Sequence, residues 1–218
     1  MIELKFSKKL EEPLRILCLG SHSDDIEIGC GGTILKLIRS VQHIEFYWVV
    51  LGSPNKERAR EALRSAKVFL QDVKKKKIVI KSFRDSYFPF QGAEIKDFFE
   101  DLKGKFSPDI VFTHYREDRH QDHRLISDLA WNTFRDHLIL EYETPKYDGD
   151  LGSPNFFVSL DGSISKRKVQ YLLQNYRTQR KKHWFTEDMF FSLLRIRGIE
   201  SGSSSKYAEA FYCRKMVF

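Results

Sequence analysis

The chain has 218 residues, of which 41% are hydrophobic and 31% are charged, and its formal net charge is +7. These proportions are typical of a globular α/β domain, and the length leaves room for a sizeable hydrophobic core. The sequence contains no run of about 18 apolar residues, so we expect no transmembrane helix and no stable membrane insertion.

The N-terminal segment and the cysteines both indicate a reducing compartment. Residues 1–16, "MIELKFSKKLEEPLRI", lack the continuous apolar core of a signal peptide, so we expect a cytoplasmic protein. Cys18, Cys30 and Cys213 are scattered and lack the close spacing of a zinc knuckle. Such usage is more typical of reduced thiols than of a disulfide framework.

Up to about residue 140, strand and helix patterns alternate. The strand patterns cover residues 14–20, 43–52, 77–83 and 109–114. The helix patterns cover residues 29–41, 55–72, 93–106 and 122–137. This alternation predicts a Rossmann-like α/β fold, a mostly parallel sheet with helices on both faces. We interpret Gly29–Gly32 as room for a tight helix start, and Lys74–Lys77 as a solvated turn.

The pattern is less regular after residue 140. Residues 141–155 carry two prolines among glycines and aspartates and indicate an irregular loop, while the "SGSSS" stretch is too short to separate domains. Two helices and a closing strand are expected at residues 165–184, 187–198 and 207–218. We therefore expect one domain over residues 1–218, with an α/β core at 14–140 and a variable part at 141–218.

Two polar clusters follow predicted strands. "GSHSDD", residues 20–25, follows the first strand, and "THYREDRHQDH", residues 113–123, includes the end of the fourth. Ligands of open α/β sheets bind at the carboxyl ends of the strands, so the two clusters are candidates for one site. Together they offer His22, Asp24, Asp25, His114, Asp118, His120, Asp122 and His123.

The first cluster fits a metal better than a dinucleotide. The G-x-G-x-x-G spacing fails because His22 stands where the second glycine belongs, and adjacent carboxylates would repel a pyrophosphate. His22, Asp25 and one histidine of the second cluster would supply two imidazoles and one carboxylate, a set that suits Zn²⁺ and also Fe²⁺. Asp24 would remain as a carboxylate beside the bound water, where a general base belongs.

Two motifs carry a family resemblance. "SHSDDIE", residues 21–27, and "HQDH", residues 120–123, resemble the A-H-P-D-D-x-E and H-x-D-H signatures of the PIG-L/LmbE family of metal-dependent N-deacetylases. The likeness covers roughly residues 14–140. Ser23 departs from the usual proline, and Asp118 stands near the second motif where some relatives carry a tyrosine.

The resemblance implies roles for individual residues. It implies His22, Asp25 and His123 as ligands of Zn²⁺, with Fe²⁺ or another divalent metal as alternatives. It implies Asp24 as the base and His120 as the cationic residue that stabilises the tetrahedral intermediate or helps protonate the departing amine. The further substrate contacts that it implies are Arg58 and Asp85.

The resemblance also implies the reaction, removal of an N-acetyl group from an amino sugar that is free, nucleotide-linked, lipid-linked or part of a glycoconjugate. The positive net charge favours a phosphate- or nucleotide-bearing substrate. Residues 141–155 and 175–185 are candidates for the rim of the substrate site. Relatives include homo-oligomers, so a homo-oligomer is possible. One alternative is a metal-dependent amidase or esterase acting on a non-sugar metabolite. Another is a basic nucleic-acid-binding protein with a degenerate site; we expect no nucleic-acid partner, because such binding does not need compact His/Asp clusters.

Overall fold

The computed structural model describes residues 12–217. Most of the N-terminal segment interpreted above, and the last residue of the expected closing strand, therefore lie outside the described residues. Within them, no helix combines the length and the apolar character that crossing a membrane requires.

Seven strands form one mixed sheet in the order β3-β2-β1-β4-β5-β7-β6. Their bounds are β1 Leu14–Gly20, β2 Ile44–Val50, β3 Lys75–Ile80, β4 Ile110–His114, β5 Leu138–Tyr142, β6 Phe156–Leu160 and β7 Tyr207–Cys213. The first five strands pair in parallel, and β7 runs antiparallel to both β5 and β6. The expected mostly parallel α/β sheet is confirmed.

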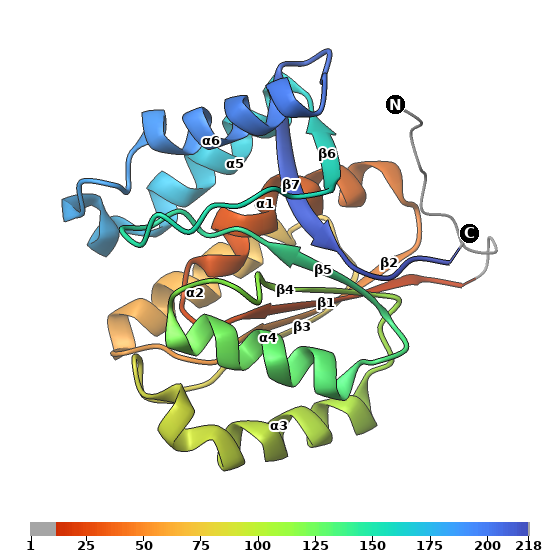
Figure 1. The fold of residues 1–218 in the computed structure, drawn as a ribbon, viewed down its shortest axis with the longest axis vertical. Helices are drawn as coiled ribbons and strands as arrows, with labels where there is room; N and C mark the ends of the chain where they lie inside the picture. Colours follow the sequence, from red (N-terminus) through yellow and green to blue (C-terminus); the bar gives the residue numbers. More distant parts are fainter. Residues whose placement is uncertain (1–11, 218) are drawn as a thin grey trace.

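Helices cover both faces of this sheet (Figure 1). The α-helices are α1 Asp25–Ser40, α2 Lys56–Phe69, α3 Gly92–Lys105, α4 Gln121–Thr133, α5 Gly162–Asn175 and α6 Glu187–Glu200, and the short 3₁₀ helices are η1 Phe88–Gln91 and η2 Arg177–Lys181. Alternate residues of the central strands point to opposite faces. One face therefore packs against α1 and α2, and the other against α3 and α4.

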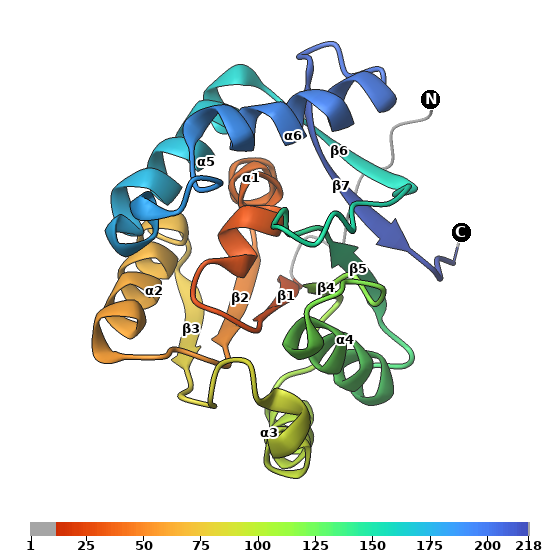
Figure 2. The same cartoon turned by 60° about the vertical axis from the view of Figure 1, so that its left-hand side comes forward.

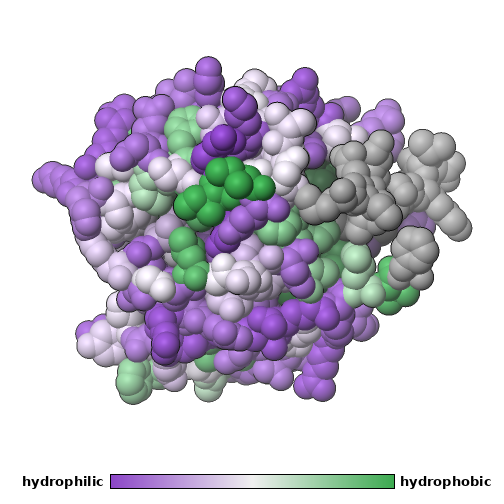
Figure 3. Space-filling view, turned by 45° about the horizontal axis from the view of Figure 1, so that its top comes forward, coloured by the Kyte–Doolittle hydropathy of each residue, from purple (hydrophilic) through white to green (hydrophobic). Residues whose placement is uncertain are grey.

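The two C-terminal helices form an additional layer over α1. Their apolar residues pack with Ile28 of α1 and Leu160 of β6 in a third hydrophobic cluster. Figure 3 shows the outer face of this part of the molecule as mostly hydrophilic with small hydrophobic patches; Ile196 and Ile199 of α6 are among its exposed apolar side chains.

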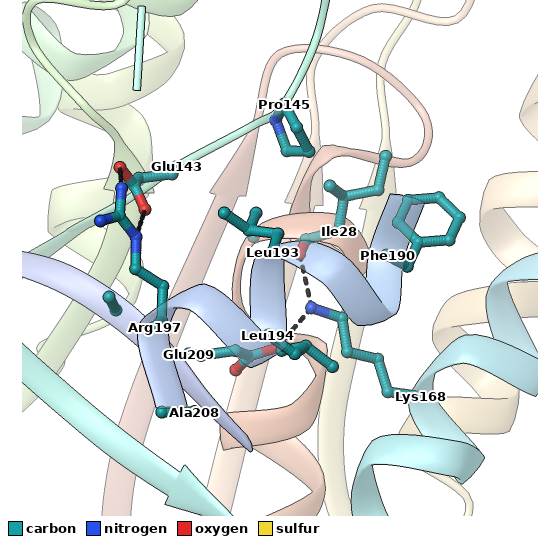
Figure 4. A pocket seen from close by; sticks show the side chains of 12 residues that line it. Ile28, Glu143, Pro145, Lys168, Phe190, Leu193, Leu194, Arg197, Ala208 and Glu209 are labelled. Carbon is teal, nitrogen blue, oxygen red and sulfur yellow. Dashed lines mark hydrogen bonds and ion pairs between the residues drawn. The ribbon is translucent and has the colours of Figure 1, made fainter. Parts of the chain in front are cut away.

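Buried ion pairs fasten this layer to the core (Figure 4). Lys168 of α5 donates to the carbonyl of Ile28 and to Glu209 of β7, each at 2.6 Å. Glu209 also accepts from two backbone N–H groups of α1. Arg197 of α6 pairs with Glu143, which follows β5, at 2.6 Å. Each charge therefore has a partner, which burial of an ion requires.

Two strands and several boundaries differ from the sequence prediction. The helix predicted to end at residue 137 ends at Thr133, and β5 follows after a four-residue turn, so the expected loop begins only after Tyr142. The strand β6 was not predicted. The helix predicted over residues 165–184 ends at Asn175, because Tyr176 leaves the helical conformation (φ −105°, ψ 61°) and buries its ring.

Two local interpretations were wrong. Helix α1 begins at Asp25, so the glycines at 29–32 lie within it rather than at its start. They let other elements approach closely: a Cβ on Gly29 would stand 2.1 Å from the ring of Tyr142 and one on Gly32 2.4 Å from Leu160. Lys75–Lys77 belong to β3 and pair with β2 instead of forming a turn.

The strand order explains why the two polar clusters meet. The chain winds outward from β1 to β2 and β3 in one direction, and from β4 to β5 in the other. The order therefore reverses between β1 and β4, where the connecting loops leave a crevice in sheets of this kind. The loop after β1 lies between α2 and α4 (Figure 2), and residues of this loop and of the start of α4 line one pocket.

Candidate metal and catalytic site

The turn between β1 and α1 presents the first cluster. The backbone N–H of His22 donates to Oδ2 of Asp25 at 2.6 Å, which closes the turn. Buried Tyr176 reinforces it, since its hydroxyl donates to the carbonyl of Ser23 and lies 2.6 Å from Glu27. Burial raises the pKa of Glu27 to about 8, so at neutral pH its carboxyl retains the proton needed for this contact.

The start of α4 presents the second cluster. His120 is the N-cap, and its Nδ1 accepts from the backbone N–H of Asp122 at 3.2 Å. Asp118 accepts from the backbone N–H of His120 at 2.7 Å and fixes the preceding loop. The rings of His120 and His123 stack with centroids 4.7 Å apart, so both imidazoles face the crevice from the first turn of the helix.

Three donor atoms of the predicted ligand set converge. Nδ1 of His22 lies 3.4 Å from Oδ2 of Asp25 and 3.1 Å from Nε2 of His123, and the latter two atoms are 3.5 Å apart. A tetrahedral zinc ion with bonds of ordinary length separates neighbouring ligand atoms by about 3.3 Å. The triangle therefore has the dimensions that such an ion requires.

A carboxylate lies behind each of the two imidazoles. The distal nitrogen of His22 is 3.1 Å from Asp122, and that of His123 is 2.8 Å from Asp118. Such carboxylates orient ligating imidazoles and raise their basicity. Asp122 is itself held by the backbone N–H groups of Ser86 and Phe88, so the loop before η1 supports the site.

His114 is close to the triangle but fits less well as a ligand. Its Nε2 lies 3.3 Å from Asp25, and the ring stacks on His123 with centroids 3.9 Å apart. The same nitrogen accepts a 2.9 Å hydrogen bond from the backbone N–H of Ser21. Its lone pair is thereby engaged, so His114 packs against the ligand set and holds the turn after β1.

The charges of the cluster favour a cation at its centre. Burial lowers the pKa of His22, but Asp25, Asp122 and Asp85 outweigh it and raise the pKa well above its usual range. Burial also raises the pKa of Asp25, yet the surrounding histidines hold it well below normal. Burial and neighbouring His114 lower the pKa of His123 to about 3, so this imidazole is neutral, as ligation requires.

Asp24 stands beside the triangle and is held by one oxygen. Its Oδ1 accepts from Arg58 at 2.8 Å, while its buried Oδ2 has no hydrogen-bond partner within residues 12–217. Burial raises the pKa of Asp24, and Arg58 opposes that shift. Arg58 also pairs with Glu61 at 3.0 Å, and Glu61 accepts a hydrogen bond from Thr178. These contacts connect α2 to η2 and hold the guanidinium of Arg58 in place.

A pocket of about 530 Å³ is lined by the triangle of His22, Asp25 and His123 together with Asp24 and His120. Asp85 lies at its edge, 3.2 Å from Nε2 of His22, and that hydrogen bond lowers the pKa of Asp85 to about 2. Arg58 lines the pocket as well, although its guanidinium is largely engaged by Asp24 and Glu61. Substrate contacts at Arg58 and Asp85 stay predictions.

Several lining residues were not singled out from the sequence. Lys146 and Tyr147 come from the β5–β6 loop, and Thr178 and Trp184 from the segment after α5. Both segments had been expected to form the rim because of their irregular or aromatic-rich sequences. Which side chains of the segment after α5 face the pocket depends on the end of α5 at Asn175, and helix periodicity did not predict that boundary.

Comparisons with known proteins agree with the α/β fold described above. The chain is 28% identical over 138 residues to the uncharacterized deacetylase YaiS of Escherichia coli (strain K12), covering 60% of this chain and 74% of that protein. The structure of the conserved protein TT1542 from Thermus thermophilus matches with a TM-score of 0.73 and 22% identity, over 94% of this chain and 96% of that one.

A second solved structure is the N,N'-diacetylchitobiose deacetylase from Pyrococcus horikoshii. It matches with a TM-score of 0.66 and 24% identity, over 94% of this chain and 87% of that chain. The PIG-L family model, described as GlcNAc-PI de-N-acetylase, matches residues 17–134, which span both motifs and more than half of the chain. The chain therefore belongs to the PIG-L family of de-N-acetylases.

Proposed function

We propose that the protein is a divalent-metal-dependent hydrolase that removes the N-acetyl group from an amino sugar. The observation that carries this proposal is the triangle of His22, Asp25 and His123, with donor atoms 3.1 to 3.5 Å apart. Two imidazoles and one carboxylate suit Zn²⁺ and also Fe²⁺, and leave room for water and substrate. When bound, such an ion supplies Lewis acidity toward water and toward the acetyl carbonyl.

The proton transfers fall to the chain's own side chains. Asp24 accepts a proton from the attacking water at Oδ2, the oxygen that Arg58 leaves free. His120 accepts a hydrogen bond at Nδ1, so its Nε2 carries a proton and donates toward the developing oxyanion. The amine departs after receiving a proton from Asp24 or His120, and the products are acetate and the free amino sugar.

The pocket supports a sugar as the substrate. Its volume of about 530 Å³ lies within the range of about 300 to 1,000 Å³ that is usual for small-molecule sites. Tyr147 and Trp184 offer aromatic surface and Asp85 offers a carboxylate for hydroxyl groups. The family description and the name of the Pyrococcus horikoshii relative, a diacetylchitobiose deacetylase, point the same way.

Metal analysis tests the site without knowledge of the substrate. Native protein incubated with Zn²⁺ or Fe²⁺ should retain about one ion, as expected for a single catalytic site. His22→Ala and His123→Ala should lose it, whereas His43→Ala, which changes an exposed histidine, should not. Equal retention in all variants would refute the ligand assignment.

A substrate panel tests the reaction. Acetate release is measured with N-acetylglucosamine, N,N'-diacetylchitobiose and an N-acetyl amino acid, using metal-loaded protein. Release from the sugars alone supports the proposal, whereas release from the amino acid alone would favour the alternative of an amidase that acts on a non-sugar metabolite.

A further inference from the structure

A basic groove continues from the site pocket along α2. Its nearer part has a volume of about 500 Å³, lies between α2 and the end of β3, and shares Pro54 and Asn55 with the site pocket. Its farther part, of about 400 Å³, shares Arg60 and Leu63 with the nearer one. Figure 2 shows α2 and β3 side by side at the edge of the sheet, next to the turn that carries the site.

The charges along this groove have one sign. Lys56, Arg60 and Lys81 line the nearer part, Arg64 and Lys67 add to the farther part, and the described lining includes no carboxylate. Lys56 and Arg60 are exposed and form no ion pair within residues 12–217. The positive end of the α2 dipole adds to the potential at Asn55.

Two lysines of α3, on the opposite face of the sheet, have carboxylate partners. On α3, Lys96 pairs with Glu100 and Lys105 with Asp101, each one helical turn away. The groove lining differs from an ordinary solvated helix face, on which acidic and basic groups alternate, because its described residues include no carboxylate. Arg64 donates to Asn175 and Lys81 lies over the rings of Phe83 and Phe98, but none of the five cations has a carboxylate partner in the lining. Cations without carboxylate partners along a concave surface attract anions and focus the field toward the pocket.

We infer that this groove, Lys56, Arg60 and Lys81 with Arg64 and Lys67, binds the anionic continuation of an N-acetylated glycan whose reacting sugar occupies the site pocket. The inference rests on the proposed deacetylase function for the identity of that sugar. The groove extends beyond the site pocket into two further hollows, so it has space for a chain rather than for one sugar. The groups that it recognises are carboxylates, sulfates or phosphates on the glycan.

The composition of the groove argues against binding of a single-stranded nucleic acid. Proteins that bind single-stranded nucleic acid combine cations with aromatic side chains on which the bases stack. The described lining of both parts of the groove contains no aromatic residue. Aromatic side chains lie instead in the site pocket, where Tyr147 and Trp184 are found.

Binding of labelled oligosaccharides, followed by fluorescence anisotropy at low and high salt, tests the inference. The anionic probe is a hyaluronan hexasaccharide, in which each repeat carries an N-acetyl group and a carboxylate; the neutral probe is a chitin hexasaccharide. Lys56→Glu/Arg60→Glu reverses two groove charges. Lys103→Glu/Lys206→Glu makes the same change of net charge at exposed lysines outside the groove lining. Thermal unfolding first establishes that both variants fold.

We expect native protein to prefer the hyaluronan probe at low salt. The groove variant should bind it about tenfold more weakly, as expected from the loss of two exposed charge contacts, and the control variant should match native protein. Equal losses in both variants, or no native preference for the anionic probe, would overturn the inference. So would tighter groove-dependent binding of a hexanucleotide, which would indicate a nucleic acid.

Acetate release separates this inference from the function on which it rests. If native metal-loaded protein releases no acetate from either glycan but still binds hyaluronan through Lys56 and Arg60, the deacetylase proposal fails and the groove assignment stands. If acetate is released from the chitin probe and the groove variant has the same affinity for hyaluronan as native protein, the deacetylase proposal stands and the groove assignment fails.

Discussion

Asp24 and Asp25 are adjacent in the chain, but their side chains have different contacts. One oxygen of Asp24 is held by Arg58, and the other is buried without a partner among the described residues. Asp25, the next residue, instead faces three histidines. Two adjacent carboxylates therefore occupy different environments, which supports the proposed roles of Asp25 as a metal ligand and Asp24 as the base.

The substitution Asp24→Asn should consequently abolish turnover while leaving the metal bound. Asparagine has nearly the same shape but cannot accept the proton, and loss of a general base lowers rates by about 10²- to 10⁴-fold. Metal content and acetate release should be measured on the same preparation. Loss of the metal, or turnover within a few-fold of native, would contradict the role of Asp24.

Asp118 is expected to act through His123. Its Oδ2 lies 2.8 Å from Nδ1 of that imidazole. Among the described residues, no other carboxylate contacts this nitrogen. Asp118→Asn should weaken metal binding by about 10- to 100-fold, the usual cost of removing such a partner. The exposed Asp128 of the same helix provides the control, because Asp128→Asn changes the same chemical group away from the site. Competition with a chromophoric chelator measures both, and equal affinities would refute the role.

At the scale of elements, the packing of α1 determines where the turn of the site lies. Gly29 faces the buried ring of Tyr142, whose hydroxyl donates to the carbonyl of Leu19 at the end of β1. A larger residue at position 29 would push α1 away from β5. Since Asp25 is the first residue of α1, such a displacement would also move a proposed metal ligand.

Gly29→Ala should therefore destabilise the fold although alanine favours helices. The added Cβ would stand 2.1 Å from the ring of Tyr142, and overpacking of this kind costs about 1 to 3 kcal/mol. Gly104→Ala in α3 is the matched control, because a Cβ there meets nothing within 4 Å. Alanine at that site should be neutral or stabilising by up to about 1 kcal/mol. Urea unfolding measures both, and equal free energies of unfolding would contradict the packing argument.

The elements that could be predicted are those with strong local patterns. The first four strand–helix units follow from hydrophobic periodicity, and the two motifs follow from their position after β1 and β4. The strands β5 and β6 were missed because each has only five residues, and β6 in addition pairs with β7, which lies far along the chain. The pairing of Arg58 with Asp24 was missed for a related reason, since it depends on how α2 packs beside the turn.

At the scale of the whole molecule, the candidate metal site joins the two halves of the sheet. His22 and Asp25 follow β1, whose outward neighbours are β2 and β3, whereas His123 lies on the helix after β4. A bound ion would hold these segments together only in the folded chain. The unfolded chain cannot maintain a triangle of donor atoms 3.1 to 3.5 Å apart, so metal binding should be linked to stability.

Zinc at about 100 times its dissociation constant should add about 2.7 kcal/mol to the free energy of unfolding. For a domain of this size that corresponds to a rise in Tm of roughly 5 to 10 °C. Differential scanning calorimetry with and without a chelator measures the shift. The Tm of His123→Ala should not rise with zinc, because the variant lacks one of the three proposed ligands. The Tm of His43→Ala should rise as much as that of native protein. If the His123→Ala variant gained as much stability as native protein, the stabilising ion would be bound elsewhere, and the two motifs would not form one metal site.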